Sequence, residues 1–357
     1  MTTKQTKTET KGVRYLGSKN KIIPTLLKVI GDLPVDDKTM IDVFTGTTRV
    51  AQAFKAHGWS VTTSDLAWAS EAYSSNFIEL SDNSHLQKYI DEMNKLTGAT
   101  GWLTENYCDV TTESGGLVRV WKPKNGKKAD VMRDYIETLD IPRKDKMCLI
   151  TSLIFSLDKI DNTVGLQQAY LKHWASKRVD TDLKVSLIPS VKGTVGNHVS
   201  GNALEIKYDK ASVAYLDPPY TPADYSTYYH IWDSITAWDK PKVSLKTNRR
   251  VDRVKSGDDR DEKMKSPWYS KKSALKATKQ LIDRLPVKYC VFSYSDEGII
   301  KKADMEELCN EYKSVVWHEK EHNRHVMSRI GAGGDDAENA KKKKLSEWII
   351  VIEKEQE

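Results

Sequence analysis

The chain has 357 residues, which suits two domains or one domain with a large insertion. Its apolar runs fall far short of the ~20 residues of a membrane-spanning helix, so we expect no helical membrane span. Four cysteines without a CxxC pair argue against a zinc site and a disulfide framework, and favour a reducing compartment. The formal net charge of +6 is a mild indication of a polyanionic partner. Residues 240–272 hold twelve Lys or Arg against five Asp or Glu, so the net positive charge of this segment exceeds that of the whole chain.

The beginning of the chain predicts a tail followed by the start of an α/β sheet. Residues 1–12 are rich in Thr and Lys, lack the apolar stretch of a signal peptide and are expected to be disordered. An amphipathic helix is followed by a buried strand at residues 40–44, a Gly-containing turn and a helix closed by Gly58. The next strand ends in Asp65. This order of elements is typical of a doubly wound α/β sheet.

The middle of the chain predicts a helical insertion over residues 70–200. Helices are expected at residues 86–96, 129–139, 146–158 and 164–175, with a loop-like stretch at 97–128. The α/β pattern then resumes, with strands at 213–216, 288–295 and 347–353, helices at 273–285 and 302–312, and a Gly- and Lys-rich loop at 331–344. We therefore predict a catalytic domain made of residues 13–69 and 201–357 around the insertion.

The strongest chemical signal is Asp217-Pro218-Pro219-Tyr220, directly after the apolar strand 213–216. In an open α/β sheet ligands bind beyond the carboxyl ends of strands, and two prolines make a rigid turn there. The Asp217 carboxylate and the Pro218 carbonyl are acceptors that together can hold an exocyclic amino group by its two N–H donors. Tyr220 offers a flat face for a planar ring. The alternative is an ordinary turn, which would not need this full set at a strand end.

The second signal is the turn Asp42-Val-Phe-Thr-Gly46-Thr-Thr, between a strand and a helix. Such a turn brings backbone close to a cofactor, and the lack of GxGxxG argues against a dinucleotide. Asp65 follows 23 residues after Asp42, at the end of the next strand. A carboxylate at that place can accept hydrogen bonds from both ribose hydroxyls of an adenosine. The alternative for Asp65 is a helix N-cap.

Three motifs of the chain resemble those of a known family. Arg14-Tyr-Leu-Gly-Ser-Lys19, Asp42-Val-Phe-Thr-Gly-Thr47 and Asp217-Pro-Pro-Tyr220 are similar to the amino-terminal, cofactor-loop and catalytic motifs of adenine-specific DNA methyltransferases of the Dam-like class. The similarity is greatest to the methylases of type IIS restriction–modification systems and their solitary relatives, and it covers residues 13–353. It implies a Rossmann-like, S-adenosylmethionine-dependent methyltransferase sheet, with target recognition in the helical insertion.

The resemblance also implies roles for individual residues. Tyr15 and Lys19 match the amino-terminal motif that contacts S-adenosylmethionine, and Asp65 matches the acid that binds its ribose. Asn202 is placed where relatives often carry an Asp that holds the adenine of the cofactor. The cofactor loop adds the expected contacts of Asp42, Phe44, Gly46 and Thr47, and Thr48 stands where many members have a second glycine. The catalytic residues are Asp217, Pro218, Pro219 and Tyr220.

The implied reaction is N6-methylation of an adenine flipped out of double-stranded DNA, at an unstacking cost of about a few kcal/mol. Adenine N6 is a poor nucleophile because its lone pair is delocalised into the ring. Accepting both N6 hydrogens at Asp217 and Pro218 favours a tetrahedral nitrogen whose lone pair faces the methyl group. The sulfonium activates its own leaving group, so we expect direct in-line transfer without a metal, with positioning as the main source of rate.

Contacts with DNA are predicted from charge. Lys122 and Lys124 lie in a basic, turn-rich stretch of the insertion, and Lys can contact phosphates or guanine. Arg249, Arg250 and Arg253 lie close together in segment 240–272, for which we predict a phosphate clamp that orders on DNA, with a solvated mobile loop as the alternative.

Several other residues have simpler interpretations. Gln167 and Gln168 are expected on a helix surface, although they could read adenine. Trp232 and Trp238 are expected in the core. His318, His322 and His325 are expected on the surface near a basic loop that faces DNA, and the eight histidines show no metal-ligand spacing.

Two other functions stay open on the sequence alone. An RNA amino-group methyltransferase uses a similar catalytic loop, although the long insertion favours DNA. A catalytically silent DNA-binding protein is the second, although the intact Asp217–Tyr220 motif and Asp65 speak against decay. We expect double-stranded DNA as the partner, with or without a cognate restriction endonuclease, and a monomer. The expected location is the cytoplasm of a prokaryotic cell, for a chain encoded by the cell or by a phage.

Overall fold

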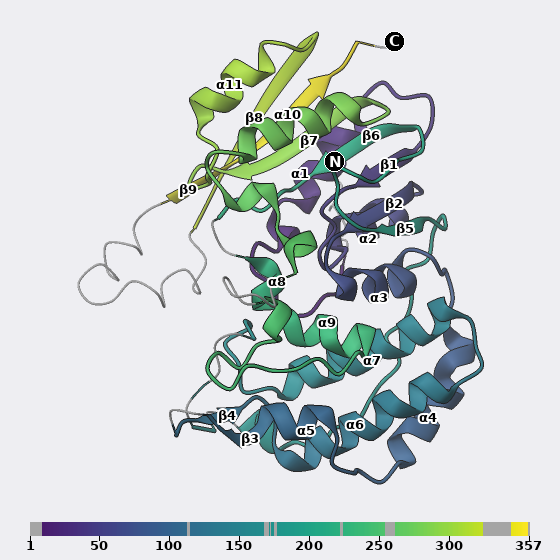
Figure 1. The fold of residues 1–357 in the computed structure, drawn as a ribbon. Helices are drawn as coiled ribbons and strands as arrows, with labels where there is room; N and C mark the ends of the chain where they lie inside the picture. Colours follow the sequence, from purple (N-terminus) through teal and green to yellow (C-terminus); the bar gives the residue numbers. More distant parts are fainter. Residues whose placement is uncertain are drawn as a thin grey trace.

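The computed structural model describes residues 9–112, 115–167, 171, 173–174, 177–221, 224–253, 261–323 and 344–355. Within them seven strands form one sheet in the order β5-β2-β1-β6-β7-β9-β8 (Figure 1). The bounds of these strands are β1 Thr39–Asp42, β2 Ser60–Asp65, β5 Asn197–Ser200, β6 Ala211–Leu216, β7 Val287–Ser295, β8 Ser314–Asn323 and β9 Lys344–Glu353. Strands β5, β2, β1, β6 and β7 are parallel, whereas β9 is antiparallel to both β7 and β8. The molecule is therefore a mixed α/β protein with a mainly parallel central sheet.

The chain path creates a switch point between β1 and β6. From β1 the chain continues to β2 on one side, whereas β6 and β7 extend the sheet on the other side. In open α/β sheets, ligands bind at such a point, in the crevice beyond the carboxyl ends of the strands. Because β1 ends at Asp42 and β6 ends at Leu216, the two strongest motifs of the sequence meet at this crevice.

Both faces of the sheet are buried, as the alternation of side chains along β9 shows. Successive side chains of a strand point to opposite faces. Ile349 and Val351 belong to one hydrophobic cluster, and Ile350 and Ile352 belong to the other. The first cluster is covered by α1, α2 and α3, and the second by α10 and α11. The bounds of these helices are α1 Ile23–Gly31, α2 Arg49–Ala56, α3 Trp68–Phe77, α10 Ala274–Arg284 and α11 Lys302–Cys309.

The remaining helices lie mostly at the end of the molecule opposite α10 and α11 (Figure 1). They are α4 Gln87–Lys95, α5 Trp102–Tyr107, α6 Pro123–Thr138, α7 Arg143–Ile160, α8 Tyr225–Tyr228 and α9 His230–Ala237, with a hairpin of β3 Cys108–Thr111 and β4 Leu117–Arg119 beside them. Trp121, Met132 and Leu153 are fully buried there, in the same cluster that covers one face of the sheet. The core is thus continuous from the sheet into the helical part.

The expected helices at 86–96, 129–139 and 146–158 are present as α4, α6 and α7. The expected helix at 164–175 is wrong, because none of its described residues is helical. The Asp161 carboxylate accepts from Thr163 N and Oγ1, and the Asn162 side chain donates to the carbonyls of Leu171 and His173. Such local side-chain bonds compete with helix formation.

The stretch 97–128 is more regular than predicted. It contains α5, the β3–β4 hairpin and the first turn of α6, which begins at Pro123, where proline's fixed φ suits a helix start. Lys124 therefore lies in a helix and not in a turn.

Two strands of the central sheet were also not predicted from the sequence. Strand β8 is an edge strand in which the apolar residues 315–317 are followed by a run of polar residues, Lys320 and Glu319 among them, so it lacks the period of a half-buried strand. Strand β5 forms the opposite edge, so the sheet takes in the last residues of the range 70–200. The tail residues 1–8, Gln168, His325 and the loop residues 331–343 lie outside the described residues.

No helix of the described part is both long and apolar enough to cross a lipid bilayer.

Candidate active site

A cavity of about 1120 Å³, part of it open to solvent, lies beyond the carboxyl ends of β1, β2, β5 and β6. It brings together residues that are far apart in the sequence. The predicted site residues that line it are Tyr15, Phe44, Gly46, Asp65, Asn202, Asp217, Pro218, Pro219 and Tyr220. Three further residues predicted for the same site, Lys19, Asp42 and Thr47, are buried close to this lining but do not form it.

The turn after β1 is held by hydrogen bonds from both sides. The Thr45 hydroxyl donates to Asp42 Oδ2 across 2.8 Å. Gly46 N donates to Asp65 Oδ2 across 2.8 Å, and Ser70 Oγ donates to the Gly46 carbonyl across 2.8 Å. Gly46 has a φ of +49°, a left-handed conformation that glycine adopts at little cost. The turn therefore presents its backbone to the cavity in a fixed form.

Burial changes the proton affinity of the acids around this turn. It raises the pKa of Asp42 to about 7, and Asp42 Oδ1 has no hydrogen-bond partner among the described residues. Burial also raises the pKa of Asp65, against the opposing effect of its bonds from backbone N–H groups such as Ala67 N at 2.9 Å. The N-cap of α3 is Ala67, so the alternative of an N-cap at Asp65 does not apply.

Thr48 keeps the backbone conformation that a glycine would have at its position. Its φ of +60° is left-handed, and its hydroxyl accepts a hydrogen bond from Gln52 Nε2 across 3.0 Å. A left-handed conformation costs a non-glycine residue roughly 1–2 kcal/mol. Thr48 thus adopts a left-handed backbone conformation without being a glycine.

Aromatic rings form one wall of the cavity. Tyr15 stacks on Tyr229, with ring centroids 4.4 Å apart and planes inclined by 18°. The Tyr229 hydroxyl accepts from Leu16 N across 2.7 Å, which fixes the amino-terminal motif on α8 and α9. Phe44 meets Trp268 edge to face at 4.8 Å. These rings suit a ligand with a planar, apolar part.

The Asp217 side chain lies in a buried group of charges. Lys19 Nζ is 3.0 Å from Asp217 Oδ1 and 2.5 Å from Glu347 Oε1. Ser293 Oγ lies 3.4 Å from Asp217 Oδ1. Burial raises the pKa of Asp217 to about 6, because its effect outweighs the opposing charge of Lys19. The two carboxylates hold the pKa of Lys19 above its usual value despite burial, so its ammonium stays charged.

Tyr220 packs the Asp217–Tyr220 turn against Gly17 and Lys19. Lys19 Nζ lies 5.4 Å from the Tyr220 ring centroid, and the Tyr220 carbonyl accepts from Ile299 N across 3.0 Å. Gly17 has a φ of +80°, and a Cβ built on it would lie 3.0 Å from the Tyr220 hydroxyl. The amino-terminal motif therefore packs directly on the Asp217–Tyr220 turn.

Asn202 lines the cavity with a side chain that is already engaged. Its Oδ1 accepts from Leu204 N across 3.1 Å, and its Nδ2 donates to Glu205 Oε1 across 3.0 Å. A ligand would have to share these bonds or replace them.

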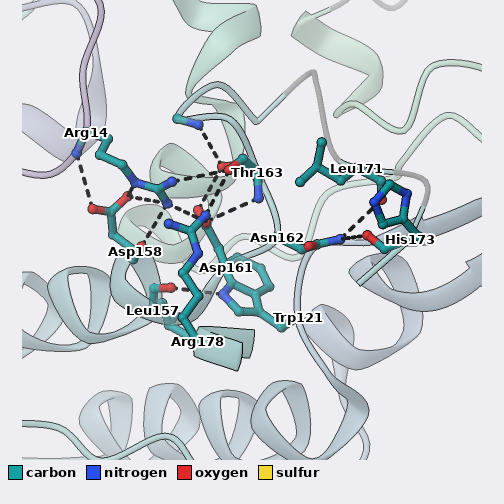
Figure 2. A network of polar contacts seen from close by, with 11 residues as sticks. Arg14, Trp121, Leu157, Asp158, Asp161, Asn162, Thr163, Leu171, His173 and Arg178 are labelled. Carbon is teal, nitrogen blue, oxygen red and sulfur yellow. Dashed lines mark hydrogen bonds and ion pairs between the residues drawn. The ribbon is translucent and has the colours of Figure 1, made fainter. Parts of the chain in front are cut away.

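A second polar network ties the amino-terminal motif to the segment after α7 (Figure 2). Arg14 donates to the carboxylates of Asp158 and Asp161 and to the Thr163 carbonyl. Arg178 donates to the same Thr163 carbonyl across 3.0 Å and to Asp161 across 3.3 Å. Asp161 is thus a buried acceptor shared by two arginines. One of them, Arg14, directly precedes Tyr15 in the sequence.

The structure corrects the expectation for Gln167, which is buried and not on a helix surface. Its Oε1 accepts from Ile231 N across 2.6 Å and from Trp232 N across 3.3 Å, so Gln167 caps the first turn of α9. Trp232 and Trp238 are buried in the core, as expected.

The arginines predicted to form a phosphate clamp, Arg249, Arg250 and Arg253, do not form an exposed clamp. Arg250 and Arg253 are fully buried, and both guanidinium groups stack on Trp68, at 4.9 and 4.8 Å from its ring. Arg250 also pairs with Asp239 and Asp252 at 2.7 and 2.9 Å. The prediction that these two side chains face phosphates is therefore wrong for this structure, because acidic and aromatic neighbours inside the protein already bind them. Arg249 is only half-buried.

Lys122 and Lys124 lie on the surface at the start of α6. Lys122 Nζ is 4.4 Å from the Trp174 ring centroid and 3.3 Å from Asp180, and Lys124 Nζ is 2.6 Å from Asp182. The Lys124 side chain is 52% exposed. The Lys122 side chain is 26% exposed, so Lys124 is the more accessible of the two.

Several cavity residues were missed by the sequence analysis. Three of them, Pro267, Trp268 and Tyr269, line the cavity. They belong to segment 240–272, which was interpreted by its charge alone and not by its aromatic residues Trp268 and Tyr269. Tyr73 also lines it, and its buried hydroxyl has no partner among the described residues. Glu347 lies 328 residues from Lys19 in the sequence, so no local signal could have revealed the pair.

Comparisons with known proteins place the chain in a family. The model of the family described as D12 class N6 adenine-specific DNA methyltransferase matches residues 15–326. The chain is 28% identical to Modification methylase LlaI of Lactococcus lactis subsp. lactis, an alignment of 96% of this chain and 55% of that protein. It is 27% identical to Modification methylase StsI of Streptococcus sanguinis, over 84% of this chain and 46% of that protein. It is 25% identical to Type II methyltransferase M.NlaIII of Neisseria lactamica, over 96% of this chain and 99% of that protein. The chain thus spans about half the length of the first two relatives and nearly all of the third.

Proposed function

Since the chain belongs to the family of D12 class N6 adenine-specific DNA methyltransferases, we propose that it transfers a methyl group from S-adenosylmethionine to N6 of a specific adenine in double-stranded DNA. One observation carries the proposal. The Asp217–Tyr220 turn at the end of β6 lines the same cavity as Gly46 and Asp65. An acceptor pair for an amino group therefore opens onto a site whose acid and aromatic rings suit an adenosine.

The residues of the cavity fit S-adenosylmethionine. Asp65 is a carboxylate at the end of β2, where it could accept bonds from ribose hydroxyls. Tyr15, Phe44 and Trp268 offer faces and edges to an adenine ring, and the left-handed Gly46 keeps the backbone free of a side chain where the ligand would approach. When bound, S-adenosylmethionine supplies a methyl group on a positively charged sulfur. We propose that this sheet is the Rossmann-like fold of S-adenosylmethionine-dependent methyltransferases.

Asp217 and the Pro218 carbonyl are proposed to hold the target amino group. Each accepts one N6 hydrogen, which turns the nitrogen lone pair toward the methyl group. As N6 forms its bond to the methyl carbon, the bond from that carbon to the cofactor sulfur would break and S-adenosylhomocysteine would leave. N6 gains positive charge in this step, and the Asp217 carboxylate stabilises that charge until one N6 proton passes to solvent. Tyr220 stacks on the flipped base. Pro219 keeps the turn rigid, so the acceptors are in place before the base arrives.

Recognition of DNA is proposed to lie in the helical region of residues 70–200. Its surface carries Lys122 and Lys124 at the start of α6, which supports contact with phosphates. The ion pairs of Asp161 with Arg14 and Arg178 connect that region to the amino-terminal motif, whose Tyr15 lines the cavity.

The proposed setting is a type II restriction–modification system, because two of the similar proteins named above are modification methylases and the third is a type II methyltransferase. A cognate endonuclease would then cut the same sequence when it is unmethylated. We propose that the protein acts as a monomer in the cytoplasm of a prokaryotic cell, where its DNA substrate lies, whether the cell or a phage encodes it.

The substrate class is tested by offering tritiated S-adenosylmethionine with duplex DNA, single-stranded DNA and structured RNA in parallel. Digestion to nucleosides and mass spectrometry identify the product. We expect N6-methyladenine from duplex DNA alone. Label on RNA would favour the RNA amino-group methyltransferase, and cofactor binding with no label on any nucleic acid would favour a silent DNA-binding protein.

A further inference from the structure

Glu347 is a buried acid that the reaction described so far does not use. It lies at the start of β9, where it is paired in register with Ser295 of β7, and its side chain is only 8% exposed. Its partner is Lys19, which is 9% exposed and reaches Asp217 on its other side. Three side chains that are remote in sequence, Glu347, Lys19 and Asp217, thus form one buried group of charges.

We propose that Glu347 is a positioning residue of the transfer reaction, which acts through Lys19 to fix the Asp217 carboxylate and to keep it an effective acceptor. This proposal rests on the proposed methyltransferase function. It assigns Lys19 to the catalytic acid, whereas the sequence motif assigned Lys19 to the cofactor.

The charges explain why a second carboxylate is needed. Lys19 alone would neutralise Asp217, and a neutralised carboxylate would stabilise the positive charge on N6 less well. With Glu347 on its other side, Lys19 is shared at 2.5 and 3.0 Å, and the three groups together keep one net negative charge. A buried carboxylate without a partner would be costly, so Lys19 also keeps both acids in place.

The geometry leaves Asp217 little freedom. Oδ1 faces Lys19 at 3.0 Å and Ser293 Oγ at 3.4 Å, and the Ser293 hydroxyl is itself 2.7 Å from the Tyr215 hydroxyl. The charged and titratable groups around Asp217 are Lys19 before α1, Asp42 on β1, Tyr215 and Tyr220 beside it, Tyr225 on α8, Tyr294 on β7 and Glu347 on β9.

The two neighbours act on Asp217 in opposite directions, and this gives a sharp test. The Glu347 charge raises the pKa of Asp217 and the Lys19 charge lowers it, while burial brings the pKa to about 6. Activity requires the carboxylate, so it is lost as the pH falls through this pKa. Glu347→Gln should move the acid limb of the single-turnover rate to lower pH, and Lys19→Met should move it to higher pH.

The experiment measures single-turnover methylation of duplex DNA between pH 5 and 9, together with the Kd of S-adenosylhomocysteine and the melting temperature. For Glu347→Gln we expect a rate about tenfold lower at pH 8, since the acceptor is weakened in the transition state, and a cofactor Kd within about twofold of wild type. Glu347→Asp should restore the position of the acid limb. The control is Glu319→Gln on β8, which removes an exposed ion pair with Lys302 and should change none of these values.

An unmoved acid limb in both Glu347→Gln and Lys19→Met, with rates that follow only the melting temperatures, would overturn the proposal. If wild-type protein methylates nothing, the methyltransferase function itself fails. The action of Glu347 through Lys19 on Asp217 is then tested by the titration of the Asp217 carboxyl carbon in NMR spectra. A lower titration midpoint in Glu347→Gln supports it, and an equal midpoint contradicts it.

Discussion

The backbone N–H of Gly46 donates to the Asp65 carboxylate across 2.8 Å, which ties the turn after β1 to the end of β2. This bond joins the two features that the sequence assigned separately to cofactor binding. It also means that Asp65 has two tasks, because one carboxylate shapes the turn and faces the cavity.

Asp65→Asn tests the ribose contact. An amide has one acceptor oxygen in place of two, so the variant loses a charge-assisted bond worth roughly 1.5–3 kcal/mol, and the Kd of S-adenosylmethionine should rise at least about tenfold. Titration calorimetry measures it. Asp82→Asn is the matched control, because Asp82 accepts from Ser84 N two residues on, as Asp65 accepts from Ala67 N, but in an exposed turn. An unchanged Kd in Asp65→Asn would remove this residue from the cofactor site.

Gly17→Ala tests the packing of the amino-terminal motif on Tyr220. Gly17 and Gly58 both have a left-handed backbone, with φ of +80° and +83°, so alanine should cost each about 1–2 kcal/mol of folding free energy. Only the new methyl group at residue 17 meets Tyr220, at 3.0 Å from its hydroxyl, whereas Gly58 has open space. We expect Gly17→Ala to lose methylation beyond its loss of stability and Gly58→Ala to keep it, as measured by single-turnover rates beside urea unfolding. Equal rates would show that this contact does not matter.

Arg250→Met tests whether Arg250 supports the fold or binds DNA. Removing a buried, paired guanidinium leaves acidic neighbours without a partner, so the free energy of unfolding should fall by about 2–4 kcal/mol. The comparison is Arg143→Met, whose side chain is 71% exposed beside Glu71 and should contribute less than about 1 kcal/mol. The salt dependence of DNA binding should stay as in the wild type. A stable variant with a flatter salt dependence would restore Arg250 to the DNA interface.

For Lys122 and Lys124 we predict the opposite: a changed salt dependence of DNA binding and an unchanged stability. If both contact phosphates, replacing them together by Gln should lower the slope of log K against log salt by about 2, equally for all DNA sequences. Melting temperature should hardly change, because their ion pairs lie at the surface. Lys279→Gln on α10 is the control, at the other end of the molecule. A slope that does not change would place the phosphate contacts elsewhere.

Apolar strands and chemical motifs were the predictable part of this molecule. β1, β6, β7 and β9 contain apolar runs, and the Asp217 turn follows one of them, so the place of the cavity at the carboxyl ends of β1 and β6 followed from the rules of open sheets. Strand β8 could not be recognised in the same way, because the polar residues of an edge strand hide its period.

Long-range pairing was the unpredictable part. Composition marked Arg250 and Arg253 as surface cations, but their partner Trp68 belongs to α3, almost two hundred residues earlier. Gln167 looked like a surface residue because the helix that it caps is formed by residues 230–237. In each case a polar side chain contacts an element that is distant in the sequence, and only the folded chain shows which element that is.

The central claim is that the protein methylates adenine at a defined DNA sequence and needs the Asp217 carboxylate to do so, and it is tested most directly by sequencing. Unmethylated genomic DNA is incubated with S-adenosylmethionine and either wild-type protein or Asp217→Ala, and N6-methyladenine is mapped by single-molecule sequencing. We predict modification at one recurring motif with the wild type and none with Asp217→Ala, while both bind the cofactor equally well. Modification that persists in Asp217→Ala, or DNA left unmodified by a wild-type protein that binds the cofactor, would contradict this account.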